Sequence, residues 1–231
     1  KDINTGAAYY VVNYDDESGS TDSVTSGTGC NLKTFYHAKG FEYRGAGWRA
    51  LLLKTASELE KLFDSKSLDI EFAVDDKLRL FVLQVRPLVG LGENDVDIDD
   101  STELLGRIRN KVGSLKKPHP YLCGDRTVFG IMPDWNPAEI IGVRPRPLAL
   151  SLYKEIITDN IWAYQRNNYG YRDLRSFPLM ISFAGLPYID VRVSFNSFIP
   201  ADISDKLANK LVNYYIDRLC KSPKNHDKVE F

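Results

Sequence analysis

The sequence has little of several features that mark whole classes of protein. Its longest apolar runs, such as residues 51–53, are three or four residues long, far short of the ~20 residues that cross a bilayer. Positive charge is not in excess, because 30 Lys plus Arg stand against 31 Asp plus Glu and the net charge is -1. Non-specific nucleic-acid binding depends on excess positive charge. We therefore expect neither a membrane nor a nucleic acid as a partner.

Cysteine is also scarce. The chain has three cysteines, Cys30, Cys123 and Cys220, an odd number with no Cys-x-x-Cys pair. This pattern favours reduced thiols in the cytoplasm over a disulfide framework or a zinc site. The chain begins at Lys1 and lacks the pattern of a secretory signal peptide, so we expect a cytoplasmic piece of a longer protein.

What the sequence does contain is typical of a globular α+β protein. Hydrophobic residues make up 43% of the 231 residues and charged residues 26%, which is ordinary globular composition. Apolar residues that alternate or cluster predict strands, and apolar residues at spacings of three and four predict helices. Strands are predicted at 8–14, 68–74, 78–85 and, in part, 179–199. Helices are predicted at 49–63, 103–112, about 148–165 and from near 202. Ser101 or Thr102 is the predicted cap of the helix at 103–112.

The two strands at 68–74 and 78–85 form a predicted hairpin with a polar surface. Side chains two apart share a face of a strand, so Asp69 and Glu71 lie together, as do Val82, Gln84 and Arg86. A turn of two or four residues would place Asp69 opposite Gln84 and Glu71 opposite Val82, with all of them on one face. A three-residue turn would place the two groups on opposite faces.

This polar face has two possible interpretations. Carboxylate oxygens are the hard ligands that Mg²⁺ prefers, and a planar guanidinium matches phosphate oxygens, so the face suits a polyphosphate carried by a divalent metal. The alternative is a solvated strand face on which opposite charges pair across the strands.

A family resemblance favours the first interpretation. The run Asp-Ile-Glu-Phe-Ala at 69–73, a short turn and then Leu-Gln-Val-Arg-Pro-Leu at 83–88 resemble the end of the ATP-grasp nucleotide-binding domain of phosphoenolpyruvate synthase and pyruvate phosphate dikinase. The predicted helix at 49–63 also lies where this family has one. The resemblance implies an ATP-grasp C-terminal subdomain, an antiparallel sheet with helices, followed by a mixed helical and strand segment.

The resemblance also implies roles for the polar face. Glu71 would be a ligand of the Mg²⁺ that accompanies ATP, with Asp69 assisting at both the metal and the nucleotide. Gln84 and Arg86 would bind the phosphates, and Arg86 would be catalytic. The family transfers phosphate from ATP to a histidine on a separate swivelling domain and then to pyruvate or another acceptor.

Two parts of such an enzyme have no counterpart in the sequence: the N-terminal half of the ATP-grasp fold and the phosphohistidine domain. His37 precedes Ala38 but lacks the Thr-Ser-His-Ala context of the phosphocarrier. We therefore expect these parts elsewhere in a longer chain, and we expect the present segment alone to be inactive and to bind ATP weakly or not at all.

The resemblance suggests three segments: 1–92, the ATP-grasp C-terminal subdomain; 93–125, a linker with a short helix; and 126–231, a mixed α+β segment. Within the last, Asn-Pro-Ala-Glu ending at Glu139 and Arg-Pro-Leu ending at Leu148 are similar to the connector of the rifampin phosphotransferase branch. A proline-rich segment packed on the domain is the alternative.

Other patterns indicate no site. The acidic run at 93–100 is interpreted as a linker rather than a metal site, and the Asn13, Asp15 and Glu17 series lacks the glycine and final glutamate of an EF-hand loop. The rival to the enzyme hypothesis is a non-catalytic interaction module that keeps a degenerate ATP-grasp face, in which residues 113–231 engage a partner.

Overall fold

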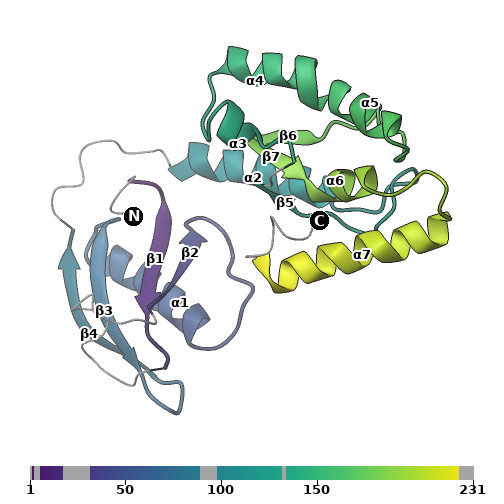
Figure 1. The fold of residues 1–231 in the computed structure, drawn as a ribbon. Coiled ribbons are helices and arrows are strands. Elements are labelled where there is room, and N and C mark those ends of the chain that lie inside the picture. The colour runs from purple at the N-terminus through teal and green to yellow at the C-terminus, as the bar shows by residue number, and fades with distance from the viewer. Residues whose placement is uncertain (1, 3–5, 18–31, 89–97, 132–133, 224–231) are drawn as a thin grey trace. The chain divides into compact units, whose positions relative to one another are not determined.

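The computed structural model divides the chain into two compact units, residues 1–106 and 107–231, and each is described here by itself (Figure 1). Among the described residues, no helix is both long and apolar enough to cross a bilayer. The chain is a mixed α+β protein with small antiparallel sheets, as the sequence predicts. The structure describes residues 2, 6–17, 32–88, 98–131 and 134–223.

Unit 1 contains two antiparallel strand pairs. β1 (Tyr9–Tyr14) pairs with β2 (Lys33–Ala38), and β3 (Leu68–Val74) pairs with β4 (Leu80–Pro87). The strand predicted at 8–14 and the predicted hairpin are therefore both confirmed.

Helix α1 (Trp48–Leu62) confirms the predicted amphipathic helix. It buries Leu52, Leu53 and Ala56, as expected for apolar residues spaced at three and four. Its first residue, Trp48, stacks on Phe72 of β3 with ring centroids 6.0 Å apart. The apolar side of the hairpin thus contacts the helix and leaves its polar side away from this contact.

A buried lysine ties β2 to the rest of unit 1. Lys39 is 7% exposed, and its ammonium donates to the carboxylate of Glu60 in α1 and to the carbonyl of Lys66, 2.8 Å away. The Tyr10 hydroxyl donates to the other Glu60 oxygen at 2.9 Å. Burial beside this carboxylate raises the pKa of Tyr10. A buried charge needs such partners, so these three side chains fix the end of β2 against α1 and the start of β3.

Helix α2 (Ile98–Leu115) is longer than the predicted 103–112. Ser101 and Thr102 lie inside the helix rather than at its cap, so the predicted start is wrong. The prediction depended on cap residues, and Ser and Thr are tolerated in helix interiors at modest cost.

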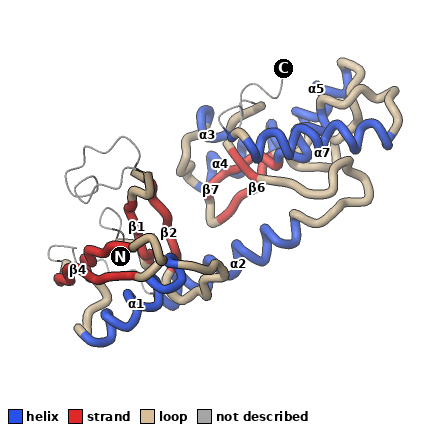
Figure 2. Tube along the Cα trace, turned by 90° about the horizontal axis from the view of Figure 1, so that it is seen from below, coloured by secondary structure: helices blue, strands red, loops and turns tan. Residues whose placement is uncertain are grey.

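Unit 2 combines a small sheet with several helices (Figure 2). The sheet has the order β5-β7-β6, and both pairings are antiparallel. The last helix confirms the helix predicted from near 202. The elements are β5 (Phe129–Gly130), α3 (Pro137–Ile140), α4 (Pro147–Tyr153), the π-helical turn η1 (Lys154–Thr158), α5 (Ile161–Asn168), β6 (Met180–Phe183), β7 (Leu186–Asp190), α6 (Val191–Ser197) and α7 (Asp205–Lys221).

The helix predicted at 148–165 is not continuous. It runs as α4, changes to the π-helical turn η1, breaks at Asn160 and resumes as α5. A π-helical turn adds one residue to the turn, and here the Asp159 N–H donates to the Lys154 carbonyl at 2.9 Å.

The strand predicted through residue 198 ends at Asp190, where α6 begins. The Asp190 carboxylate accepts from the N–H groups of Arg192 and Val193, which satisfies donors that a helix start leaves free. All seven residues of α6 are buried, and the helix packs in the core with Val212 and Ile216 of α7.

Candidate functional site

The hairpin brings all four predicted site residues together on one face. Asp69 lies opposite Arg86, and Glu71 lies opposite Gln84. Directly opposite residues of an antiparallel pair share a face, and Asp69 and Glu71 share one by their spacing. The predicted pairings, Asp69 with Gln84 and Glu71 with Val82, are wrong, whereas the predicted grouping of the four polar residues holds.

A β-bulge explains both results. Five residues, 75–79, separate the strands, and the register shifts between Glu71 and Phe72 so that Phe72 pairs with Val82. Leu83 is the extra residue on β4. An odd number of turn residues would by itself put the polar groups on opposite faces, but a bulge adds one residue to one strand and restores the alignment. Val82 thereby leaves the polar face.

Arg86 lies between the two carboxylates. Its Nε donates to Asp69 Oδ2 at 2.8 Å, and its Nη2 is 3.6 Å from Glu71 Oε1. The pKa of Arg86 is raised above its ordinary value, chiefly because its guanidinium donates this hydrogen bond to Asp69. The three side chains are 36–56% exposed, so water screens these pairs and they contribute little to stability.

The same arrangement fits a magnesium-bound polyphosphate. Mg²⁺ usually takes one or two protein carboxylates and completes its shell with water and substrate phosphates, and Asp69 and Glu71 supply two carboxylates on one exposed face. In the part of the chain that the structure describes, no group of three or more His, Cys, Asp or Glu side chains could hold a metal by itself. Substrate phosphates and water would complete the shell of a metal held by Asp69 and Glu71, with Arg86 beside them as a cation for the phosphates.

The other sequence candidates have ordinary structural roles or fall outside the described residues. His37 lies in β2, and its Nε2 is 2.9 Å from the carbonyl oxygen of Phe41. Asn136 caps α3, because its side-chain oxygen accepts from the Ala138 N–H at 3.0 Å. Residues 93–97, which are most of the acidic run, lie outside the described residues, and so does Cys30.

Sequence reasoning missed a buried ion pair in unit 2. Asp134, whose side chain is 1% exposed, accepts from Arg166 at 2.5 Å and from the Ser194 hydroxyl at 3.0 Å. Burial raises the pKa of Asp134 even though Arg166 opposes the shift. The pair joins α5 and α6 to the segment that leads into α3. No periodicity marks it, because its members lie 32 and 60 residues apart in the sequence.

Sequence reasoning also missed four charged residues that line a pocket in unit 2, Lys111, Lys154, Asp159 and Arg175. The two lysines and the aspartate come from α2, η1 and the residue after η1. Only the π-helical turn and the position of β6 bring them together.

Comparison with known proteins adds no assignment: no protein-family model matches the chain, and no curated protein and no solved structure shows significant similarity to it.

Proposed function

We propose that unit 1 is the C-terminal subdomain of an ATP-grasp domain and binds Mg²⁺-ATP in an enzyme similar to phosphoenolpyruvate synthase. The observation that carries this proposal is the position of Arg86 between Asp69 and Glu71, with Gln84 opposite Glu71 on the same face. A solvated strand face without a ligand does not require these four residues to lie together. Two carboxylates match the ligand preferences of Mg²⁺, and a guanidinium matches those of phosphate.

In this proposal Arg86 supplies the positive charge beside the two carboxylates when no metal ion is bound. Without nucleotide its guanidinium balances the two carboxylates. With Mg²⁺-ATP present, Asp69 and Glu71 would hold the metal ion, and the Arg86 guanidinium would offset the negative charge of the phosphates. Because all three side chains are partly exposed, this binding needs no rearrangement of the buried core.

The rest of the enzyme would lie in other segments of the same longer polypeptide. The N-terminal half of the ATP-grasp domain would complete the nucleotide cleft, and a histidine on a swivelling domain would accept the phosphoryl group and pass it to pyruvate or another acceptor. The apolar side chains left exposed on β4, Phe81, Val82 and Leu83, support a further segment that covers this strand. The described cysteines, Cys123 and Cys220, are free thiols, which suits a cytoplasmic enzyme.

The test is Mg²⁺-ATP binding and phosphohistidine formation in the full-length protein. Glu71→Ala and Arg86→Ala should each weaken binding about tenfold or more, because an interaction with a charged group contributes ~1.5–3 kcal/mol and each 1.4 kcal/mol corresponds to a factor of ten. The matched control is Arg79→Ala, which removes an arginine that pairs with Asp75 at 2.7 Å in the turn of the same hairpin. Unchanged binding in Glu71→Ala and Arg86→Ala would favour the non-catalytic interaction module.

A further inference from the structure

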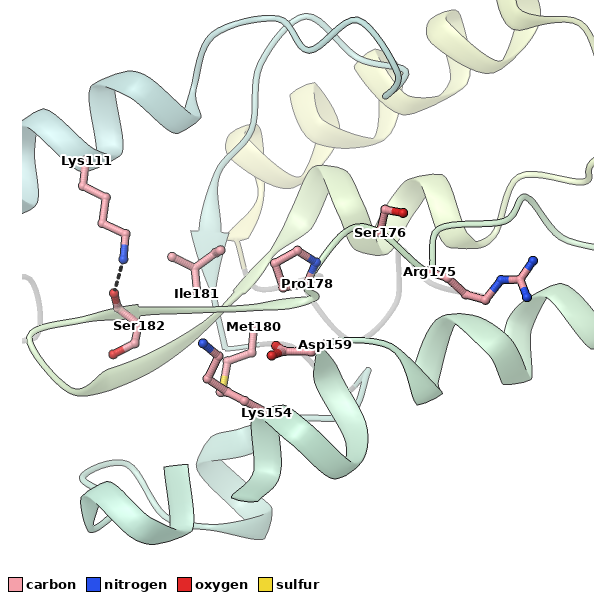
Figure 3. Close-up of a pocket in the computed structure, with 9 residues that line it drawn as sticks. All are labelled: Lys111, Lys154, Asp159, Arg175, Ser176, Pro178, Met180, Ile181 and Ser182. Atoms are coloured by element: carbon pink, nitrogen blue, oxygen red, sulfur yellow. Dashed lines mark hydrogen bonds between the residues drawn. The ribbon is translucent and has the colours of Figure 1, made fainter. Parts of the chain in front are cut away.

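A pocket lies in unit 2 beside β6, and none of the residues that line it is assigned above to ATP (Figure 3). Its volume is about 350 Å³, in the range of small-molecule sites. Pro178, Met180 and Ile181 supply apolar walls, and charged side chains reach it from α2, η1 and the residues before β6.

Two lysines give the pocket available positive charge. The Lys111 ammonium donates to the carbonyl oxygen of Ser182 at 2.9 Å, which leaves two of its protons for another acceptor. The Lys154 ammonium forms no hydrogen bond or ion pair with any residue that the structure describes. Arg175 also lines the pocket, but Asp173 pairs with its guanidinium, which points away from the lysines and from Asp159 in Figure 3.

A carboxylate of the pocket has an unused buried oxygen. Asp159 Oδ1 is buried and has no hydrogen-bond partner among the described residues. Buried polar atoms are nearly always satisfied, and leaving one without a donor costs free energy. In Figure 3 the Asp159 carboxylate and the Lys154 ammonium both point toward Met180, yet the two are not paired. A ligand that donates a hydrogen bond would satisfy this oxygen.

The π-helical turn explains why Lys154 and Asp159 face the same pocket. The two residues are five apart, and the Asp159 N–H donates to the Lys154 carbonyl at 2.9 Å. In an α-helix, residues five apart project more than a quarter-turn away from one another, whereas a π-helical turn places them one above the other. Such turns occur often at functional sites.

β6 adds backbone donors to the pocket. The Asp190 N–H donates to the Leu179 carbonyl, which makes Met180 and Ile189 a non-hydrogen-bonded pair of the antiparallel ladder. The peptide groups of Met180 and Ser182 therefore point away from β7, toward the open edge where Lys111 reaches the Ser182 carbonyl. Their two N–H groups have no partner among the described residues.

We propose that this pocket binds a phosphate monoester that carries a neighbouring hydroxyl group. Lys111, Lys154 and the free N–H groups of β6 hold the phosphate, and the hydroxyl donates to Asp159 Oδ1. Two lysines against one carboxylate leave net positive charge for the phosphate, and lysine binds phosphate well as a point charge. This site shares no residue with the hairpin, so the test of this proposal is independent of the test of the proposed ATP site.

The proposal is tested by titrating the 231-residue chain and following the amide resonances of Met180 and Ser182. The probes are glycerol 3-phosphate, methyl phosphate, which lacks the hydroxyl, glycerol, which lacks the phosphate, and glycerate, which carries hydroxyl groups and a carboxylate but no phosphate. We expect saturable shifts with glycerol 3-phosphate, at least threefold weaker binding of methyl phosphate and glycerate, and no shift with glycerol.

Two substitutions assign the contacts. Lys154→Met should weaken glycerol 3-phosphate at least fivefold, whereas Lys210→Met, at an exposed position of α7, should leave it unchanged. Asp159→Leu is close in size, has no hydrogen-bond acceptor and should make glycerol 3-phosphate bind no better than methyl phosphate. The dispersed amide spectrum of each variant reports that unit 2 remains folded.

Three outcomes would overturn the proposal. They are shifts that do not saturate, equal effects of Lys154→Met and Lys210→Met, and an unchanged preference for glycerol 3-phosphate in Asp159→Leu. Binding of an extended peptide to the Met180 and Ser182 amides, with no response to any phosphate, would instead identify a strand-addition edge and would also refute it.

Discussion

Replacing Asp134 by Asn tests how unit 2 is held together. The native carboxylate accepts from Arg166 at 2.5 Å and from Ser194 at 3.0 Å, and Arg166 also lies over the ring of Phe198, 4.2 Å from its centroid. An asparagine has the same shape and can still accept from Arg166 and meet the Ser194 hydroxyl. The substitution therefore removes the negative charge while retaining most of the local geometry.

The expected loss in the free energy of unfolding is about 2 kcal/mol. Removing one partner of a buried ion pair typically costs 3–5 kcal/mol, because the other charge is left without compensation. The Arg166 side chain is 20% exposed, so some water reaches the arginine, and the asparagine retains the hydrogen bonds. Burial raises the pKa of Asp134, so the neutral asparagine also avoids the desolvation cost of the buried carboxylate, and the loss falls below that range.

Urea unfolding followed by tryptophan fluorescence measures this loss. A Trp48→Phe background leaves only Trp135 and Trp162, both in unit 2. Arg166→Met and the double variant complete a cycle, in which the double variant should be more stable than the sum of the single losses predicts by 1 kcal/mol or more. A loss below 1 kcal/mol for Asp134→Asn, or additive losses, would refute the claim that this pair stabilises unit 2.

Two further predictions concern buried charges. Lys39→Met should destabilise unit 1 by about 2–4 kcal/mol in urea unfolding, because Glu60 then keeps only the Tyr10 hydroxyl; a change below 1 kcal/mol would contradict this role. Burial raises the pKa of Asp190 above its ordinary 3.8. Between the unfolded pKa and the raised folded pKa, the native state therefore holds a proton that the unfolded chain has lost, and the free energy of unfolding falls as pH rises. Asp190→Asn should flatten the slope of unfolding free energy against pH, and an unchanged slope would count against it.

The sequence predicts the hairpin well but not its register. The strands, the turn and the grouping of Asp69, Glu71, Gln84 and Arg86 follow from period-two alternation and turn residues. The pairing depends on a bulge at Leu83, and a bulge has no required residue type here that would reveal it. A single extra residue therefore moved the partners while leaving the polar face intact.

Helix α6 shows where alternation misleads. Val191, Val193 and Phe195 alternate with Arg192 and polar residues, which is the pattern of a half-exposed strand. The helix is instead buried on every side, so its polar groups find partners inside the protein. Arg192, for example, donates to the carbonyls of Lys117 and Leu115. Tertiary contacts of this kind override local periodicity.

The pocket of unit 2 was beyond sequence reasoning for a related reason. Lys111, Lys154 and Asp159 are ordinary surface residue types with no motif spacing. Their meeting depends on the π-helical turn and on the open edge of β6, and neither has a reliable signal in the sequence. Long-range placement, rather than residue type, defines this site.

The central claim is that Asp69, Glu71 and Arg86 bind a metal-nucleotide complex, and paramagnetic broadening tests it most directly. Mn²⁺ replaces Mg²⁺ with ATP, and the amide resonances of residues 1–106 are recorded in the full-length protein, in which the nucleotide cleft would be complete. The account predicts the strongest broadening at residues 69–71 and 84–86, lost in Glu71→Ala and retained in Arg79→Ala. Broadening centred elsewhere, or unchanged in Glu71→Ala, would contradict it.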